Sequence, residues 1–347
     1  MSAPLRYNQP AMQGYQLHAF GYAGLKLEGL PLPEPQPGEL LLKVSAASLN
    51  YRDLLMLRGS YDPRQPLPLV PLSDCVGKVV EVGADVVDFS VGDRVCPIFA
   101  QDWLAGAPTK QLLRSTLGGP RPGTLREYML VPERSVVRVP DSLSDVEAAC
   151  LPCAGVTAYN ALVSLGGARP GDVVLIQGSG GVSVFALQIA KALGARVIAT
   201  SSSAAKRERL LELGAEHVID YTTETRWGSK ARSLAGGEGV DIVVEVGGSG
   251  TLDESLRAVK PGGTIAIIGV LSGGKGPVSL LPVLMQQVRL QGVMVGPRDC
   301  FEQLVRCVAS ANIHPLVDRV FAFDQARQAF EHLEAARHFG KVVIQVE

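Results

Sequence analysis

The sequence predicts a two-domain α/β protein in which a doubly wound parallel sheet follows a mostly β segment. The chain has 347 residues, more than one ordinary domain needs, and 46% of them are hydrophobic, enough to bury a substantial core. From residue 172 onward, short apolar runs alternate with helix-forming stretches that end at glycine. This alternation is typical of a parallel sheet with helices on both faces.

The first 143 residues have the pattern of a mostly β domain. Strand-like runs at 40–44, 77–83 and 93–97 lie between turns. The proline-dense segment 31–38 suits neither a helix nor a central strand, so we expect a surface connection there. The pattern changes near residue 140, because the segment 144–147, Ser-Asp-Val-Glu, has the form of a capping box that opens a helix. We therefore place the first domain at 1–143.

The second domain, predicted at 144–297, carries the alternation of strands and helices. Its expected strands are 173–177, 196–200, 217–220, 241–245, 264–268 and 290–295. Helices are expected at 182–193 and 206–213, and each is followed by a glycine that can end it. The tail, 298–347, lacks this alternation, and we expect it to return to the first domain.

The composition of the chain argues against nucleic acids and membranes as binding partners. The chain has 33 basic and 34 acidic residues, so it offers no basic field for nucleic acid or an anionic membrane. No apolar run approaches the ~20 residues of a membrane span, and the first residues lack the apolar core of a signal peptide. The six cysteines show no paired disulfide spacing. We expect a cytoplasmic protein that binds a small molecule and neither nucleic acid nor membrane.

The motif after the first strand of the second domain predicts a phosphate-binding loop. Its members are Gly178, Ser179, Gly180, Gly181 and Val182. Glycine permits a tight turn and a close approach of the backbone to a pyrophosphate, and the following helix N-terminus offers free N–H donors. Ser183 stands where the full fingerprint has a third glycine, and a plain glycine-rich turn is the alternative. The strand–turn–helix context favours a dinucleotide site.

The end of the next strand favours NADPH over NADH. An NAD site usually has an acid at this strand end to bind the ribose hydroxyls, and here the strand ends in threonine and serines. Ser201 and Ser202 can donate to a 2′-phosphate, and Lys206 and Arg207 add positive charge one helical turn later. The alternative is that the serines only cap the next helix and the basic pair faces solvent.

Motifs along nearly the whole chain resemble those of one superfamily. Besides the phosphate loop they lie at 48–53, 77–83, 91–95, 123–129, 154–159, 213–221, 260–264 and 340–343. The chain is similar to the medium-chain dehydrogenase/reductase superfamily, in its zinc-independent branch of quinone oxidoreductases and polyketide-synthase-type enoyl reductases, often named alcohol dehydrogenases. The resemblance implies a GroES-like catalytic domain, a Rossmann domain and a nicotinamide cofactor.

The resemblance also implies roles for individual residues, carried over by matching position. It implies contacts with the 2′-phosphate at Ser201, Lys206 and Tyr221, and contacts near the nicotinamide at Asn50 and Thr157. Further cofactor contacts are implied at Gly247, Ile268, Gly269, Val270, Val295 and Gly296. A homodimer formed through the last strand of the Rossmann sheet is implied as well.

The metal ligands of zinc-dependent relatives are largely missing. Those relatives hold zinc with a Cys, a His followed by Glu, and a second Cys or Asp. Asn50 stands at the first position and the segment 72–74, Leu-Ser-Asp, replaces Gly-His-Glu, so that only Cys153 remains. One thiolate and one carboxylate do not make a tetrahedral site. The stretch 99–124 also lacks the four cysteines of the structural zinc lobe, and we predict no metal.

The predicted activity follows from this missing Lewis acid. Conjugate reduction suits such a site better than reduction of a plain ketone, because charge spreads into an enolate that hydrogen-bond donors stabilise. Tyr51 is the candidate catalytic donor; alternatively it only packs, and water supplies the proton. We predict an NADPH-dependent oxidoreductase acting on an enone, quinone or related carbonyl substrate. A zinc-free alcohol dehydrogenase and a cofactor-binding protein with little catalysis are the alternatives.

Overall fold

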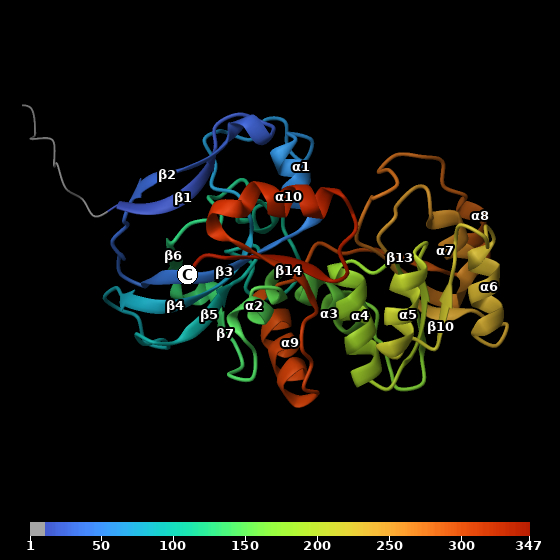
Figure 1. Cartoon of the computed structure of the whole chain (residues 1–347). Helices are drawn as coiled ribbons and strands as arrows, with labels where there is room; N and C mark the ends of the chain where they lie inside the picture. Colours follow the sequence, from blue (N-terminus) through green and yellow to red (C-terminus); the bar gives the residue numbers. More distant parts are fainter. Residues whose placement is uncertain (1–10) are drawn as a thin grey trace, which may run out of the picture. The chain divides into compact units, whose positions relative to one another are not determined.

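The computed structural model describes residues 11–347 and confirms the α/β class (Figure 1). The chain forms two compact units. The first comprises Met1–Cys153, Pro297–Val305 and Val317–Glu347, and the second comprises Ala154–Gly296 and Arg306–Leu316. Each unit has its own sheet. No helix within the described residues is long and apolar enough to cross a membrane.

The first unit is built on a sheet with the strand order β14-β15-β3-β4-β5-β7, in which β6 also pairs with β3. Its strands are β3 (Glu39–Leu49), β4 (Asp74–Val82), β5 (Arg94–Pro97), β6 (Tyr128–Pro132), β7 (Val136–Arg138), β14 (Val317–Ala322) and β15 (Lys341–Gln345). Neighbours pair antiparallel except β14 and β15, which are parallel. A separate hairpin joins β1 (Ala11–Leu17) to β2 (Leu25–Pro31).

The helices of this unit are η1 (Tyr22–Gly24), α1 (Tyr51–Leu57), η2 (Leu112–Arg114), η3 (Glu133–Ser135), α2 (Asp145–Ala148), η6 (Phe323–Gln325) and α10 (Ala326–Glu334). Two of them, α2 and α10, pack on its sheet, and the others lie in the connections between strands. Leu40 and Leu42 of β3 share a buried cluster with Phe330 and Leu333 of α10. This cluster fixes β3, whose carboxyl end leads directly into α1.

The second unit contains a parallel sheet with the strand order β10-β9-β8-β11-β12-β13. Its strands are β8 (Val173–Gln177), β9 (Arg196–Thr200), β10 (His217–Ile219), β11 (Val240–Glu245), β12 (Val259–Ile267) and β13 (Arg289–Gly292). Every residue of β8 is buried, as expected for a strand covered on both faces. The first strand, β8, pairs with β11, and the strand order therefore reverses between them. Parallel sheets of this kind bind ligands beyond the carboxyl ends at that point.

The helices of the second unit are α3 (Val156–Tyr159), η5 (Asn160–Ser164), α4 (Gly181–Ala192), α5 (Ala204–Glu212), α6 (Trp227–Leu234), α7 (Leu252–Ala258) and α8 (Leu280–Met285). Of these, α3 and η5 precede the first strand, and the others follow strands. Two segments, η4 (Leu151–Gly155) and α9 (Arg298–Ser310), run across the boundaries between the units.

Three boundaries differ from those predicted from the sequence. The tail 298–347 does not return to the first unit as a whole, because Arg306–Leu316 belongs to the second unit. The capping box of Ser144 and Glu147 does open a helix, α2, but this helix packs on β3 and β4, and residues 144–153 therefore group with the first unit. The last strand, expected at 290–295, ends at Gly292. Val295 has a φ of 54°, a left-handed conformation that a strand does not contain.

Candidate functional site

The phosphate loop has the geometry that the sequence predicts. Gly178 has a φ of 70°, which favours glycine, and Gly180 is the N-cap of α4. A Cβ atom built on Gly178 or Gly180 would meet no atom within 4 Å. Packing within the protein therefore does not require glycine at position 180, whereas a ligand lying against that backbone would. Ser183, at the place of the third glycine, is accommodated by donating to the Gln177 carbonyl at 2.7 Å.

A buried carboxylate, which sequence analysis missed, shapes the loop beside the phosphate loop. Glu245 ends β11 and accepts hydrogen bonds from Gln177 Nε2 at 2.7 Å and from the N–H groups of Gly247 and Gly248 at 2.8 and 2.9 Å. The Thr251 hydroxyl donates to it at 2.5 Å. Glu245 thus fixes the turn that contains Gly247 at the place where the strand order reverses. An acid at the end of an apolar strand was the signal available in the sequence.

The predicted 2′-phosphate residues lie at the ends of β9 and β10. Ser203 caps α5 by accepting the N–H of Lys206 at 3.4 Å, so one of the serines has the alternative role considered above. Ser201 is buried and Ser202 is exposed, and neither caps this helix. The Arg207 guanidinium pairs with Asp220 at 2.8 Å, which neutralises its charge. Lys206, in the first turn of α5, remains the candidate cation for a phosphate.

The residues assigned to the other end of the cofactor fall into two groups in this unit. Thr157 is buried in α3, and Asn160 just after it donates from Nδ2 to the Val295 carbonyl at 2.6 Å. This bond holds the left-handed Val295 next to Gly296, a conformation that costs energy for a β-branched residue. The loop 268–270 follows β12, and the Ile268 N–H donates to the Glu245 carbonyl at 2.9 Å. Glu245 therefore fixes both loops.

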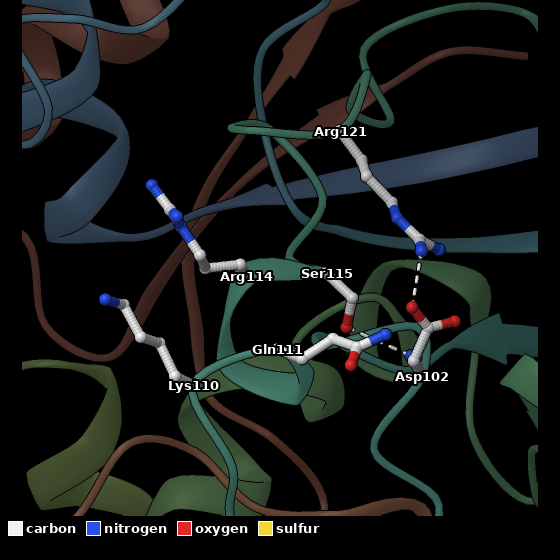
Figure 2. A pocket seen from close by; sticks show the side chains of 6 residues that line it. All are labelled: Asp102, Lys110, Gln111, Arg114, Ser115 and Arg121. Atoms are coloured by element: carbon white, nitrogen blue, oxygen red, sulfur yellow. Dashed lines mark hydrogen bonds and ion pairs between the residues drawn. The ribbon is translucent and has the colours of Figure 1, made fainter.

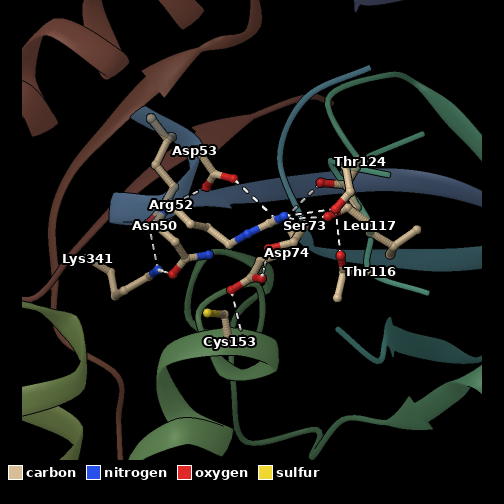
Figure 3. A network of polar contacts seen from close by, with 12 residues as sticks. Asn50, Arg52, Asp53, Ser73, Asp74, Thr116, Leu117, Thr124, Cys153 and Lys341 are labelled. Atoms are coloured by element: carbon tan, nitrogen blue, oxygen red, sulfur yellow. Dashed lines mark hydrogen bonds and ion pairs between the residues drawn. The ribbon is translucent and has the colours of Figure 1, made fainter. Parts of the chain in front are cut away.

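The first unit contains a buried polar network where β3 ends (Figure 3). Lys341, at the start of β15, is only 3% exposed. Its Nζ donates to the Leu49 carbonyl and to Asn50 Oδ1, both at 2.6 Å. The Asn50 N–H in turn donates to Asp53 Oδ2 at 2.7 Å, which begins α1. Lys341 belonged to a sequence motif, but no feature of the sequence indicated that it contacts Asn50.

Asp74 joins this network from the start of β4. The Ser73 hydroxyl donates to Asp74 Oδ1 at 2.7 Å, and the Cys153 N–H donates to Oδ2 at 3.1 Å. Burial raises the pKa of Asp74, and the positive charge of Lys341 opposes this. Burial also raises the pKa of Asp53, to about 6, although the positive charge of the nearby Arg52 lowers it in part. Two carboxyls and two cations thus share a water-poor site.

The residues at the positions of the family's zinc ligands do not fit a metal ion. The structure brings Asn50, Ser73, Asp74 and Cys153 together, but Asn50 Oδ1 is bonded to an ammonium. Burial raises the pKa of the Cys153 thiol, so a zinc ion, which binds a thiolate, would first have to displace the proton of that thiol. Within residues 11–347 no three His, Cys, Asp or Glu side chains are placed to hold a metal ion.

Arg52 fixes the loop that stands where the structural zinc lobe would be. Its guanidinium donates to the carbonyls of Leu117 and Gly119 at 2.8 and 3.0 Å. It also lies against the rings of Tyr61 and Phe99, each with its centroid 4.9 Å away. Its ion pair with Asp53 is 3.8 Å long, longer than the bonds to the loop. Trp103, buried, packs within the same loop region.

Tyr51, the predicted catalytic residue, is the first residue of α1 and is 40% exposed. Its phenol makes no hydrogen bond to another of the described residues. It therefore does not belong to the buried network below it, and its hydroxyl is available to a ligand.

The first unit also has an open cavity of about 560 Å³ (Figure 2). It is lined by Asp102, Lys110, Gln111, Arg114, Ser115 and Arg121. Arg121 pairs with Asp102, and Ser115 and Arg121 flank the loop held by Arg52. None of the predicted site residues lines this cavity.

Two family models match the chain. The model described as the alcohol dehydrogenase GroES-like domain matches residues 36–141, and the one described as zinc-binding dehydrogenase matches residues 181–310. A zinc-type alcohol dehydrogenase-like protein of Schizosaccharomyces pombe is 42% identical over 94% of this chain and 96% of its own. An acryloyl-coenzyme A reductase of Metallosphaera sedula is 32% identical over 92% of this chain and 96% of its own.

Solved structures match over the same length. A crystal structure of an NAD-dependent alcohol dehydrogenase has a TM-score of 0.88 and 36% identity, covering 97% of this chain and 100% of its own. A mycobacterial protein in complex with NADPH has a TM-score of 0.79 and 29% identity, covering 96% of this chain and 100% of its own.

Proposed function

This chain belongs to the medium-chain dehydrogenase/reductase superfamily and is an oxidoreductase of that superfamily, and we propose that it reduces a conjugated carbonyl compound with NADPH and without zinc. The proposed substrates are enones, quinones and related carbonyl compounds. The single observation that carries the proposal is the bond from the buried Lys341 ammonium to Asn50 Oδ1. A cation is already built into the place where relatives bind a metal ion.

Zinc would be disfavoured at this site for an electrostatic reason. A divalent ion beside the Lys341 ammonium would experience strong like-charge repulsion in a water-poor environment. The ligands would also have to be freed, because Asp74 already accepts from Ser73 and Cys153, and Asn50 from Lys341. We infer that the chain does not bind a catalytic metal here, whatever its zinc-type relatives do.

The dinucleotide site supports NADPH by its residues. The open space over Gly180 can take a pyrophosphate at the N-terminus of α4. Bound NADPH would supply the hydride. Ser201, Ser202, Lys206 and Tyr221 could hold the 2′-phosphate, and the acid beside Tyr221, Asp220, is neutralised by Arg207. An NADH enzyme would instead need an acid free to accept from the ribose hydroxyls.

The substrate class follows from what the chain offers in place of a Lewis acid. Addition of hydride to the β-carbon of a conjugated system moves an electron pair to the carbonyl oxygen, and hydrogen-bond donors stabilise the resulting enolate. Tyr51, exposed and unbonded, is the proposed donor, and water is the alternative proton source. One relative is named acryloyl-coenzyme A reductase. Acryloyl-coenzyme A is a conjugated thioester, and its reduction would also add hydride to a carbon–carbon double bond conjugated with a carbonyl group.

A homodimer through the edge of the second unit's sheet is part of the proposal. β13 is the outer strand of that sheet, and Leu280, Leu281, Leu284 and Met285 of the preceding α8 are exposed. An uncovered edge beside apolar side chains favours pairing with a second copy. A monomeric mass by light scattering at micromolar concentration would rule it out.

The decisive experiment is a cofactor-consumption assay with and without prior dialysis against a chelator. We expect NADPH to be consumed with enones or quinones, chelation to leave the rate unchanged, and metal analysis to find less than stoichiometric zinc. If chelation abolished activity and zinc were stoichiometric, the metal-free proposal would be wrong. If NADP were reduced by alcohols while enones and quinones were inert, the alternative alcohol dehydrogenase activity would be favoured.

A further inference from the structure

The Lys341 ammonium is a buried cation whose hydrogen bonds go to two specific acceptors. Of its three protons, two go to the Leu49 carbonyl and Asn50 Oδ1. A buried ammonium is costly unless it is hydrogen-bonded and its charge is compensated. Asp74 and Asp53 are both buried nearby, and the charge of Lys341 lowers the pKa of each against the effect of burial. Lys341 therefore supplies positive charge to a site that would otherwise carry excess negative charge.

The same bond determines which way the Asn50 amide faces. An ammonium only donates, so Asn50 must turn its oxygen to Lys341 and its nitrogen away. The Asn50 amide lies close enough to Asp74 to lower the pKa of that carboxyl. Yet Asn50 Nδ2 is buried and has no hydrogen-bond partner of ordinary geometry among residues 11–347. An amide nitrogen has two protons, so at least one remains for a ligand.

An unpaired buried donor is a rare and costly feature. Leaving such a group unsatisfied destabilises the folded protein, and most buried donors in native proteins have a partner. Alanine or leucine at position 50 would avoid the cost if the residue only filled space. A proton of Nδ2 without a partner among the described residues points to an acceptor that arrives from outside the chain.

We propose that Lys341 is a positioning residue that takes over the electrostatic task of a metal ion by holding and polarising Asn50, whose Nδ2 donates to a carbonyl oxygen of the bound ligand. The inference rests on the proposed metal-free reduction. A charged donor on Oδ1 withdraws electron density from the amide and strengthens its N–H groups as donors. The donor is then strongest when the carbonyl oxygen gains charge, as hydride forms the new C–H bond and the C=C electron pair moves toward oxygen.

The carbonyl oxygen can belong to the substrate or to the carboxamide of the dinucleotide. The two cases predict different effects of a Lys341 substitution on kcat and on the Kd for NADPH. If it belongs to the substrate, loss of Lys341 lowers kcat and leaves the Kd for NADPH unchanged. If it belongs to the carboxamide, the Kd for NADPH rises as well. Titration of NADPH fluorescence on the free protein measures that Kd separately from turnover.

The test compares Lys341→Met with Lys43→Met. Lys43 lies on β3 of the same sheet, but its ammonium pairs with Glu347 at 2.6 Å on the surface, so its loss should not change activity. We expect Lys341→Met to lower kcat about 10- to 100-fold, the size of loss typical for a weakened oxyanion donor. Lys341→Arg, which keeps a charged donor, should recover part of that loss.

A double-mutant cycle tests whether Lys341 acts through Asn50. Asn50→Leu should lower kcat by a similar factor, and adding Lys341→Met to it should cause little further loss, because the two residues act as a unit. Asn50→Asp is the control for a loss of activity that is caused by misfolding. It keeps an acceptor for Lys341 but replaces Nδ2 with an oxygen, so the variant should fold and its kcat should fall. Thermal unfolding of each variant reports whether the fold is retained.

Three results would overturn the inference while leaving the proposed function intact. One is wild-type activity in Lys341→Met, as in Lys43→Met. Another is additive losses in the double variant, which would make Lys341 independent of Asn50. The third is full activity in Asn50→Asp. If the wild type itself failed to reduce any enone or quinone with NADPH, the proposed function would fail instead.

Discussion

The half-buried phosphate loop of the second unit and the buried polar network of the first unit are both functional candidates, but they are encoded differently. The phosphate loop is one continuous segment, 178–182, placed by the strand before it and the helix after it. The network joins Asn50, Asp74, Cys153 and Lys341. Of these, Asn50 and Lys341 are 291 residues apart in the sequence. A local motif can be identified along the chain, whereas a site assembled by strand pairing cannot.

The two regions also differ in how they would treat a ligand. The phosphate loop presents backbone over open space, so that almost any anionic diphosphate can approach it. The network presents one side-chain donor whose direction is fixed by a buried charge. The two proposals therefore assign cofactor binding and specific chemistry to two separate structures, and substitutions in each should have different effects.

Gly180→Val should give the largest effect and tests the idea that the loop serves a ligand rather than the fold. Gly180 has a φ of −74° and open space at its Cβ, so a side chain fits the free protein. The same side chain would occupy the path of the pyrophosphate. We expect the Kd for NADPH, measured by calorimetry, to rise at least about 100-fold, equal to ~3 kcal/mol, with little change in melting temperature.

Gly29→Val is the matched control for this variant. Gly29 lies on β2 and also has no atom within 4 Å of a built Cβ, so the substitution should alter neither stability nor binding. Normal NADPH binding by Gly180→Val would show that the pyrophosphate does not lie against this backbone.

Lys206→Ala should give an intermediate effect and sharpens the cofactor assignment within the second unit. Loss of a charged contact with the 2′-phosphate is expected to raise the Kd for NADPH about 10-fold and that for NADH less than about twofold. Arg209→Ala, on the same helix α5, is the control and should leave both unchanged. Equal weakening of both dinucleotides by Lys206→Ala would contradict the 2′-phosphate assignment.

Tyr51→Phe should give an effect no larger than that of Lys206→Ala, and it separates the role of the exposed phenol from that of the buried network. If the hydroxyl donates to the substrate oxygen, kcat should fall about 10-fold at unchanged KM, since one general acid or donor contributes on that scale or more. Tyr61→Phe, which keeps the ring beside Arg52, should have no effect. Wild-type kcat in Tyr51→Phe would leave water as the proton source.

The sequence by itself determined the parts that depend on local chemistry. Glycines at 178 and 180, an apolar strand before them and a helix after them suffice to predict a phosphate loop, because each requirement concerns neighbours in the chain. Serines without an acid after β9 similarly indicate the type of cofactor. The capping box at Ser144 correctly predicted the start of a helix, but not the unit on which that helix packs.

Only the tertiary structure decided the roles of Lys341, Glu245 and Arg52. Pairing of β15 with β3 places the Lys341 ammonium beside Asn50, and that pairing is a long-range event which no local pattern encodes. In a buried, water-poor site each polar group needs a hydrogen-bond partner. For this reason Glu245 holds two loops in place, and Lys341 fixes the orientation of the Asn50 amide. Side-chain identity supplies charge and hydrogen-bonding capacity, and the fold decides which groups meet.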